Sequence, residues 1–197
     1  MTRPAITRDD LLGAEDYERR RDEIRRRIMA VKRRRRVPCG EHATFHFESR
    51  ETMIYQIHEM LRIERSWDRP GAVDDELEAY APLVPRGDEL VATLMFEYET
   101  PEERDEHLTR LVGIDRHVWL QVGDTEPVRA QIDDAQVSDT RISSVQYVRW
   151  SLDAPRRELL RRDGTVVRVG IDHPHYTASA VLGEETRREL ASDLTEE

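Results

Sequence analysis

One segment near the C-terminus groups side chains that could bind a metal or transfer protons. Asp172-His173-Pro174-His175-Tyr176 offers two imidazoles and a carboxylate within five residues, and imidazoles titrate near neutral pH. The proline between the histidines fixes the local backbone in an extended form. The segment predicts either metal ligands or an acid–base group. A hairpin turn whose polar side chains face water is the alternative.

A second candidate is a carboxylate on a predicted helix over residues 50–67. At 100° per residue, Glu64 falls near the centre of the apolar sector and Gln56 at its edge, whereas His58, Glu59 and Arg62 are expected to point away. A carboxylate on an inward face must be paired, protonated or bound to a metal. The alternatives are that the last turn has already left the core, or that a buried arginine pairs with Glu64. The apolar sector consists of Met53, Ile54, Ile57, Met60 and Leu61.

The third candidate lies on a predicted strand over residues 43–48. Strict alternation places Phe45 and Phe47 on one face and His46 and Glu48 on the other. Residues two apart on one face are about 7 Å apart, so His46 and Glu48 could share an ion. A strand face that is simply solvated is the alternative.

The elements that must position these groups are short helices and strands without regular crossovers. This order predicts an α+β domain with an antiparallel or mixed sheet. We expect a single domain, in which residues 1–36 contain a long basic amphipathic helix and residues 37–197 form the α+β body. Helices are predicted over residues 7–35, 50–67, 73–83, 101–112, 155–162 and 184–194, and strands over residues 43–48, 89–99, 117–122, 127–132, 143–152, 166–171 and 176–182.

The composition excludes several kinds of site. The single cysteine, Cys39, excludes an internal disulfide, a cysteine-ligated iron–sulfur cluster and a four-cysteine zinc site. The single lysine, Lys32, follows no glycine-rich loop and lies in a basic run that we expect to be solvated, which disfavours Schiff-base chemistry. No apolar run approaches the ~20 residues that span a bilayer. We therefore expect a soluble cytoplasmic protein with no membrane partner.

The charge is distributed unevenly along the chain. Residues 17–36 hold eleven basic and three acidic residues, although the chain has a net charge of −10. A basic stretch of this kind is a footprint of nucleic-acid binding. Its apolar stripe fits equally well with a helix that docks on the acidic body or on a partner protein, and nucleic-acid binding is the less favoured expectation. A homodimer is also compatible with the spacing of that stripe, which consists of Tyr17, Ile24, Ile28 and Val31.

Several motifs together resemble an uncharacterised bacterial family catalogued as domain of unknown function 3501. The resemblance covers nearly the whole chain, and the central helix is its most specific part. The motifs are ITRDDLL from Ile6, YERRRDE from Tyr17, FESRETMIYQIHEMLRIER from Phe47, ELEAY from Glu76, SVQYV from Ser144 and DHP from Asp172.

The resemblance implies protein partners and a metabolic context but no activity. Genes of the family often lie beside those for rubrerythrin and an iron–sulfur oxidoreductase, which implies these two as protein partners. This chain has Ser49 and His58 where the family commonly has asparagine and glutamine. The positions that match the family pattern, and would carry a site if the pattern marks one, are Glu48, Arg50, Gln56, Glu59, Arg62, Glu64, Gln146, Tyr147, Asp172 and His173.

From the residues and the resemblance we predict an accessory or regulatory protein of iron-redox or peroxide-stress metabolism that binds a divalent metal. Glu64, Asp172 and His173 are the predicted ligands, in a pocket shared by the central helix and the last hairpin. Glu48 and Glu59 are reserve ligands, and Gln56, Gln146 and Tyr147 are predicted to contact a small ligand. The chain lacks the Glu-x-x-His helix pair of ferritin-like di-iron proteins.

Three alternatives remain at this point, the third of which is a purely structural scaffold. The first is an enzyme that uses carboxylate–histidine acid–base chemistry on an anionic small molecule. In it His173 is the base, Glu64 is a further catalytic candidate, and Arg50 or Arg62 holds the substrate. The second is nucleic-acid binding through the arginine-rich helix.

Overall fold

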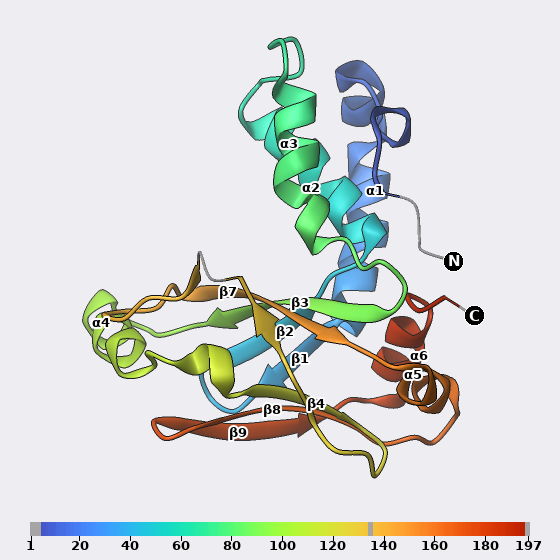
Figure 1. Cartoon of the computed structure of the whole chain (residues 1–197). Helices are drawn as coiled ribbons and strands as arrows, with labels where there is room; N and C mark the ends of the chain where they lie inside the picture. The colour runs from blue at the N-terminus through green and yellow to red at the C-terminus, as the bar shows by residue number, and fades with distance from the viewer. Residues whose placement is uncertain (1–4, 134–135, 196–197) are drawn as a thin grey trace.

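The computed structural model describes residues 5–133 and 136–195 and has the predicted α+β fold. Two antiparallel sheets lie one above the other, and an arm of three helices stands on the outer face of the upper sheet (Figure 1). The arm consists of α1 (Ala14–Arg34), α2 (Arg50–Ile63) and α3 (Ala72–Tyr80).

The upper sheet has five strands in the order β1-β2-β3-β7-β6, and the lower sheet has four in the order β5-β4-β8-β9. Every described strand pair is antiparallel. The strands are β1 (Arg36–Cys39), β2 (Ala43–Phe47), β3 (Glu89–Phe96), β4 (Val118–Val122), β5 (Val128–Arg129), β6 (Gln131–Ile132), β7 (Val145–Ser151), β8 (Val167–His173) and β9 (Tyr176–Val181).

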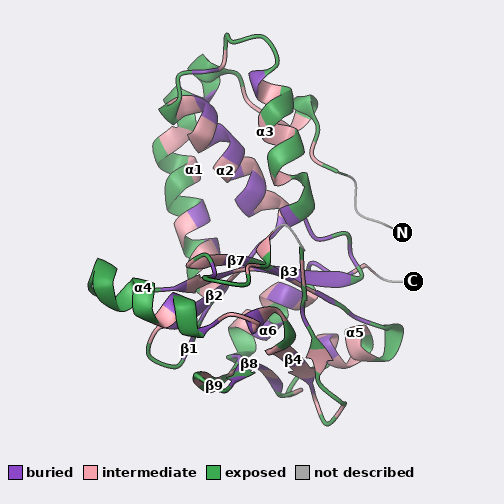
Figure 2. Cartoon of the chain, turned by 60° about the vertical axis from the view of Figure 1, so that its left-hand side comes forward, coloured by how far each residue is buried: buried purple, intermediate pink, exposed green. Residues whose placement is uncertain are grey.

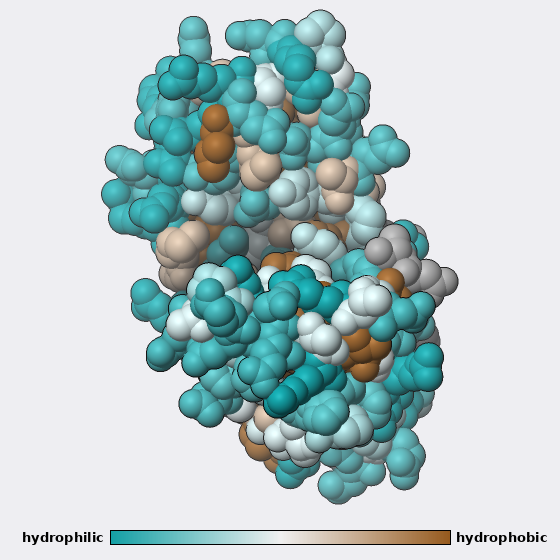
Figure 3. All heavy atoms as spheres, turned by 90° about the vertical axis from the view of Figure 1, so that its left-hand side faces the viewer, coloured by the Kyte–Doolittle hydropathy of each residue, from teal (hydrophilic) through white to brown (hydrophobic). Residues whose placement is uncertain are grey.

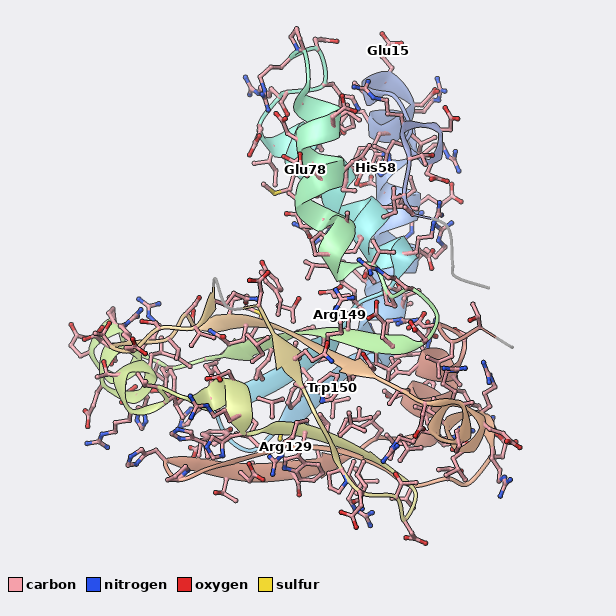
Figure 4. The ribbon with its side chains drawn as sticks, viewed as in Figure 1. Glu15, His58, Glu78, Arg129, Arg149 and Trp150 are labelled. Carbon is pink, nitrogen blue, oxygen red and sulfur yellow. The ribbon has the colours of Figure 1, made fainter. Side chains whose placement is uncertain are left out.

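The main core fills the space between the sheets. Many residues of the facing strands are buried (Figure 2), and Trp150 lies between the sheets (Figure 4), with its ring centroid 5.9 Å from that of Phe45 and 5.8 Å from that of Phe47. Because side chains alternate along a strand, the residues between these inward positions face the arm instead. The outer face of the five-stranded sheet is therefore the floor on which the arm stands. Its β3 residues are Glu89, Val91, Thr93 and Met95, which alternate with the core residues Leu90, Ala92, Leu94 and Phe96.

Shorter helices cover the two ends of the sandwich. α4 (Pro101–Arg110) lies at one end, and α5 (Ala154–Arg161) and α6 (Glu184–Ala191) lie at the other (Figure 1). Single 3₁₀ turns occur at η1 (Arg8–Asp10), η2 (Ala81–Leu83) and η3 (Ile114–Arg116). Among the described helices, none combines the length and the apolar character that crossing a membrane requires.

Two predicted boundaries near the N-terminus were wrong. The first helix begins at Ala14 rather than Thr7, because Gly13 adopts an extended N-cap conformation and Thr7 caps only the short turn η1. Residues 37–40 were expected to be a break after that helix, yet β1 occupies Arg36–Cys39. Pro38 is tolerated there because β1 is an edge strand, where a missing N–H costs no sheet hydrogen bond.

The basic helix docks on acidic groups of its own chain, as one of the predicted alternatives required. Arg21 of α1 pairs with Glu59 of α2 at 2.7 Å, and Arg34 pairs with Glu189 of α6 at 2.8 Å. Arg35, at the end of α1, pairs with Asp193 at 2.6 Å. Much of the positive charge of α1 is thus balanced within the fold.

Tyr176 joins the lower sheet to the turn between β1 and β2. Its hydroxyl donates to the carbonyl oxygen of Cys39 at 2.7 Å and accepts from the backbone N–H groups of His42, at 3.1 Å, and Ala43, at 2.9 Å. One phenol therefore satisfies three main-chain groups. Tyr176 belongs to the segment that was predicted as a site, and its role is structural.

We expect Tyr176→Phe to lower the free energy of unfolding by about 2–4 kcal/mol, because three hydrogen bonds of about 1 kcal/mol each are lost. Urea denaturation of the wild type and the variant measures the difference. Tyr98→Phe is the matched control, since the Tyr98 hydroxyl is buried without a hydrogen-bond partner, and it should leave stability unchanged or raise it slightly. Equal effects of the two substitutions would contradict this assignment.

Candidate functional site

The structure does not form the predicted pocket between the central helix and the last hairpin. Glu64 lies at the end of α2 in the arm, whereas Asp172 and His173 lie on β8 in the lower sheet, so the sandwich separates them (Figure 1). Glu64 is exposed because α2 ends at Ile63 and Arg65 takes a left-handed conformation with φ of 53°. The alternative that the last turn has left the core is the correct one.

The predicted ligands on β8 already have partners. Asp172 accepts from Arg129 at 2.8 Å and from Nδ1 of His117 at 3.1 Å, and the hydrogen bond from Arg129 keeps the pKa of Asp172 below its usual value (Figure 4). His173 donates from Nε2 to the carbonyl oxygen of Val112 at 3.1 Å, and its Nδ1 accepts from the backbone of His175 at 3.2 Å. Both ring nitrogens of His173 are therefore occupied, and burial lowers its pKa.

The reserve ligand Glu59 is equally engaged. It accepts from Arg21 at 2.8 and 2.7 Å and from the Tyr17 hydroxyl at 2.6 Å, and the hydrogen bonds from Arg21 lower its pKa to about 2. In the described parts of the chain, no group of three His, Cys, Asp or Glu side chains is placed to hold a metal ion. The residues predicted as ligands do not fit a divalent-metal site.

The predicted anion-binding arginines hold the arm together. Arg50 pairs with Asp10 at 2.6 Å, and Arg62 pairs with Glu18 at 2.8 Å. The described residues place neither of them beside His173, so the predicted combination of an arginine with that base is not formed.

His58 was expected to point away from the core and is buried. Its ring stacks on Tyr17 with centroids 4.5 Å apart, and Nε2 accepts from the backbone N–H of Leu12 at 2.8 Å (Figure 4). Burial lowers the pKa of His58, which keeps the ring neutral at pH 7. The prediction failed because α2 packs against α1 on one side and α3 on the other, and so has two buried faces.

Other candidate residues do come together, beneath the arm. Side chains of β2, β3 and β7 lie beneath the arm, and two hollows open over them, one below α1 and one below α3, a surface we call the groove (Figure 3). His46 pairs with Thr93, and Thr93 pairs with Tyr147, so these three form one row across the floor. Glu48, which directly follows β2, lies beside this row. Glu48 and Tyr147 were both predicted from the sequence.

Gln146 was predicted as a ligand contact and is not in the groove. It is buried on the opposite face of β7, where its amide donates to the carbonyl oxygen of Ser143 at 2.9 Å. Alternation along β7 separates it from Tyr147. Gln56 is not among the residues that line the hollows of the groove, and its side chain lies near the Tyr80 hydroxyl group, whose pKa is raised by burial.

One part of the groove is a hollow of about 350 Å³ that we call the charged hollow. Glu48 is 9% exposed and lines it, with Thr52 donating to one carboxylate oxygen at 2.7 Å and Thr93 to the other at 2.8 Å. No described Lys, Arg or His lies within ion-pair distance of this carboxylate. The lining residues are Met29, Lys32, Arg35, His46, Phe47, Glu48, Thr93 and Met95.

Lys32 and His46 supply the other polar groups of the charged hollow. Nζ of Lys32 lies 5.5 Å from the ring centroid of Tyr55 and forms no ion pair with a described residue. His46 has no hydrogen bond among the described side chains, and burial together with the positive charge of Arg36 lowers its pKa. The sequence prediction left Lys32 in solvent, but α1 packs on the sheet and brings it to the hollow. The signal that pointed to it was its rarity, as the one lysine in the chain.

The other part is a hollow of about 610 Å³ that we call the tyrosine hollow, lined by Tyr80 and Tyr147. Arg149 lies at its edge and is fully engaged, since it donates to both oxygens of Glu89, at 2.6 and 2.7 Å, and to the carbonyl oxygen of Pro82 (Figure 4). The lining residues are Ala79, Tyr80, Pro82, Leu83, Val91, Gln131, Ile132, Asp133, Gln136, Tyr147, Val148 and Arg149.

Comparisons with known proteins agree with the resemblance seen in the motifs. A family model described as a protein of unknown function, DUF3501, matches residues 5–194. A crystal structure of a protein of unknown function from Burkholderia pseudomallei K96243 is 40% identical, with a TM-score of 0.90, and the match covers 98% of this chain and 100% of that one. No curated protein matches the chain.

Proposed function

Because the chain belongs to the family of unknown function DUF3501, we propose its function from the groove itself: it binds a small organic anion there and carries out acid–base chemistry on it. This is the enzyme alternative drawn from the sequence, with Glu48, His46 and Lys32 in place of Glu64, His173 and the arginines.

The observation that carries the proposal is the state of Glu48. Removing a carboxylate from water is costly unless a positive charge or several hydrogen bonds compensate it. Glu48 has two hydroxyl donors and, among the described residues, no cation within ion-pair distance of its carboxylate, and it lines the charged hollow. A buried carboxylate that lines a hollow is one of the few placed polar groups by which a small-molecule site orients its ligand.

The neighbouring groups suit complementary roles. Lys32 offers an ammonium group with no ion-pair partner among the described residues, which can hold an anionic group of the ligand. Arg35 lines the same hollow, but Glu189 and Asp193 engage its guanidinium. Glu48 would accept a proton from the bound molecule. His46, neutral at pH 7, would take up or return a proton on the same side of the sheet.

Titration of the protein with small carboxylates, followed by NMR, tests this proposal. We expect at least one of butanoate, benzoate and phenylacetate to bind with a Kd of about 1 mM or lower. Lys32→Met should weaken that binding at least tenfold, whereas Arg33→Met, an exposed substitution next to it, should leave it unchanged. Equal affinities of the two variants, or no binding of any carboxylate, would refute the proposal.

The accessory role in iron or peroxide metabolism, with rubrerythrin or an iron–sulfur oxidoreductase as partner, stays a prediction from the resemblance. Nucleic-acid binding and the homodimer likewise stay predictions.

A further inference from the structure

We infer that the anion bound in the groove has an uncharged aromatic body, which lies in the tyrosine hollow while the anionic group lies at Lys32. This inference rests on the proposed function and extends it from the head group of the ligand to its body.

The tyrosine hollow has the size and lining of a ligand pocket. Its volume of about 610 Å³ lies within the ~300–1,000 Å³ of small-molecule sites, which are mostly apolar with a few placed polar groups. Leu83, Val91 and Ile132 contribute apolar surface. Polar groups come from the two tyrosines, from two glutamines, and from Asp133 and Arg149, and both charged side chains already have partners. This lining favours an uncharged body over a charged one.

The two tyrosines give the hollow aromatic surface from two different elements. Tyr80 comes from the end of α3 and Tyr147 from β7, and both line the hollow without a ring contact between them. Tyr147 is 41% exposed, which is unusual for a side chain of this size at the floor of a recess. A planar ring inserted between them could stack on both, which adds to the gain from burial alone.

Hydrogen bonds hold the walls of the hollow in place before a ligand binds. The backbone N–H of Tyr147 donates to Oε1 of Gln136 at 2.8 Å, and Arg149 donates to the carbonyl oxygen of Pro82. Walls that are already ordered lower the entropic cost of binding.

The charged side chains indicate which end of the ligand lies in which hollow. Arg149, the cation that lines the tyrosine hollow, is bound by Glu89 and Pro82, and Asp133 also has a partner of its own. Neither is available to a charged body. The row from His46 through Thr93 to Tyr147 crosses two strand spacings, which is about 10 Å. A ligand of roughly that overall length, from an anionic group at one end to the far edge of a ring at the other, reaches both hollows.

We would test this with three probes that differ in one property each. 4-Phenylbutanoate has both the ring and the charge, octanoate has the charge and similar length without the ring, and 4-phenylbutanamide has the ring without the charge. We expect 4-phenylbutanoate to bind about tenfold more tightly than octanoate, the gain expected from ring stacking. Tyr147→Ala should abolish that preference, whereas Val181→Ala, an exposed substitution on β9, should keep it. Thermal melts establish that both variants are folded.

The outcomes separate this inference from the proposed function. Equal affinity for 4-phenylbutanoate and octanoate, or an unchanged preference in Tyr147→Ala, overturns the aromatic body and leaves the anion site standing. Equal binding of the acid and the amide, both insensitive to Lys32→Met, overturns the anion site and supports the ring site. Failure of all three probes to bind at millimolar concentration overturns both.

Discussion

Arg35→Met should lower the free energy of unfolding by about 3–5 kcal/mol, the cost expected when one partner of a buried ion pair is removed. Arg35 is 3% exposed, and its guanidinium donates to the two oxygens of Asp193 at 2.6 and 3.0 Å. It also donates to a carboxylate oxygen of Glu189 at 3.1 Å and to the carbonyl oxygen of Glu48 at 3.3 Å. One side chain thus connects α1, α6 and the segment that carries the groove carboxylate.

Chemical denaturation of the wild type and of Arg35→Met measures this loss in the free energy of unfolding. Two further variants serve as comparisons. Arg33→Met changes an exposed arginine of the same helix, and we expect a change within about 0.5 kcal/mol. The double variant Arg35→Met/Asp193→Leu removes both charges, and it should be more stable than Arg35→Met alone, because a buried ion pair can often be replaced by apolar side chains at little cost. A loss below 1 kcal/mol in the single variant would show that this network does not hold the arm to the body.

The sequence was informative where the two-residue alternation of a strand determines which side chains are buried. Alternation of residues 43–48 correctly assigned Phe45 and Phe47 to the core and His46 and Glu48 to the opposite face. The same reasoning applied to residues 145–151 would have separated Gln146 from Tyr147, because Val148 and Trp150 mark the buried face of that strand. Treating the motif as one block hid this distinction.

The sequence could not show which faces of the helices and sheets pack against one another. Periodicity orients a side chain relative to its own element, whereas the separation of Glu64 from His173 depends on the arm and the lower sheet lying on opposite faces of the five-stranded sheet. The burial of His58 likewise depends on a second helix packing on α2. Lys32 reaches the groove only because α1 rests on that sheet. Such contacts between distant segments have no local signature.

The second large effect concerns Glu48, for which we expect stability and function to change in opposite directions. Glu48→Gln keeps the shape of the side chain, and its amide can accept from one threonine hydroxyl and donate to the other. It also removes the charge that the fold leaves without a cation. We expect the free energy of unfolding to rise by about 1–2 kcal/mol at pH 7, since the amide avoids the cost of burying a carboxylate that has no cation within ion-pair distance among the described residues.

Glu89→Gln is the matched control for this substitution. Glu89 is 5% exposed on the same sheet, and both of its oxygens accept from Arg149. Replacing it leaves the Arg149 charge without its partner, so we expect a loss of about 2–4 kcal/mol. If Glu48→Gln destabilised the protein as much as Glu89→Gln does, Glu48 would be a structural residue.

The Glu48→Gln variant is also tested for ligand binding and for proton transfer. Lys32 and the tyrosine hollow are untouched in Glu48→Gln, so 4-phenylbutanoate should bind within about threefold of the wild-type affinity. Proton exchange with a bound substrate should instead fall by about 10²–10⁴-fold, the usual contribution of a general base. A residue that costs stability when unliganded and is needed only for proton transfer fits the trade-off expected of an active site. Loss of binding together with loss of turnover would instead place Glu48 among the groups that hold the ligand.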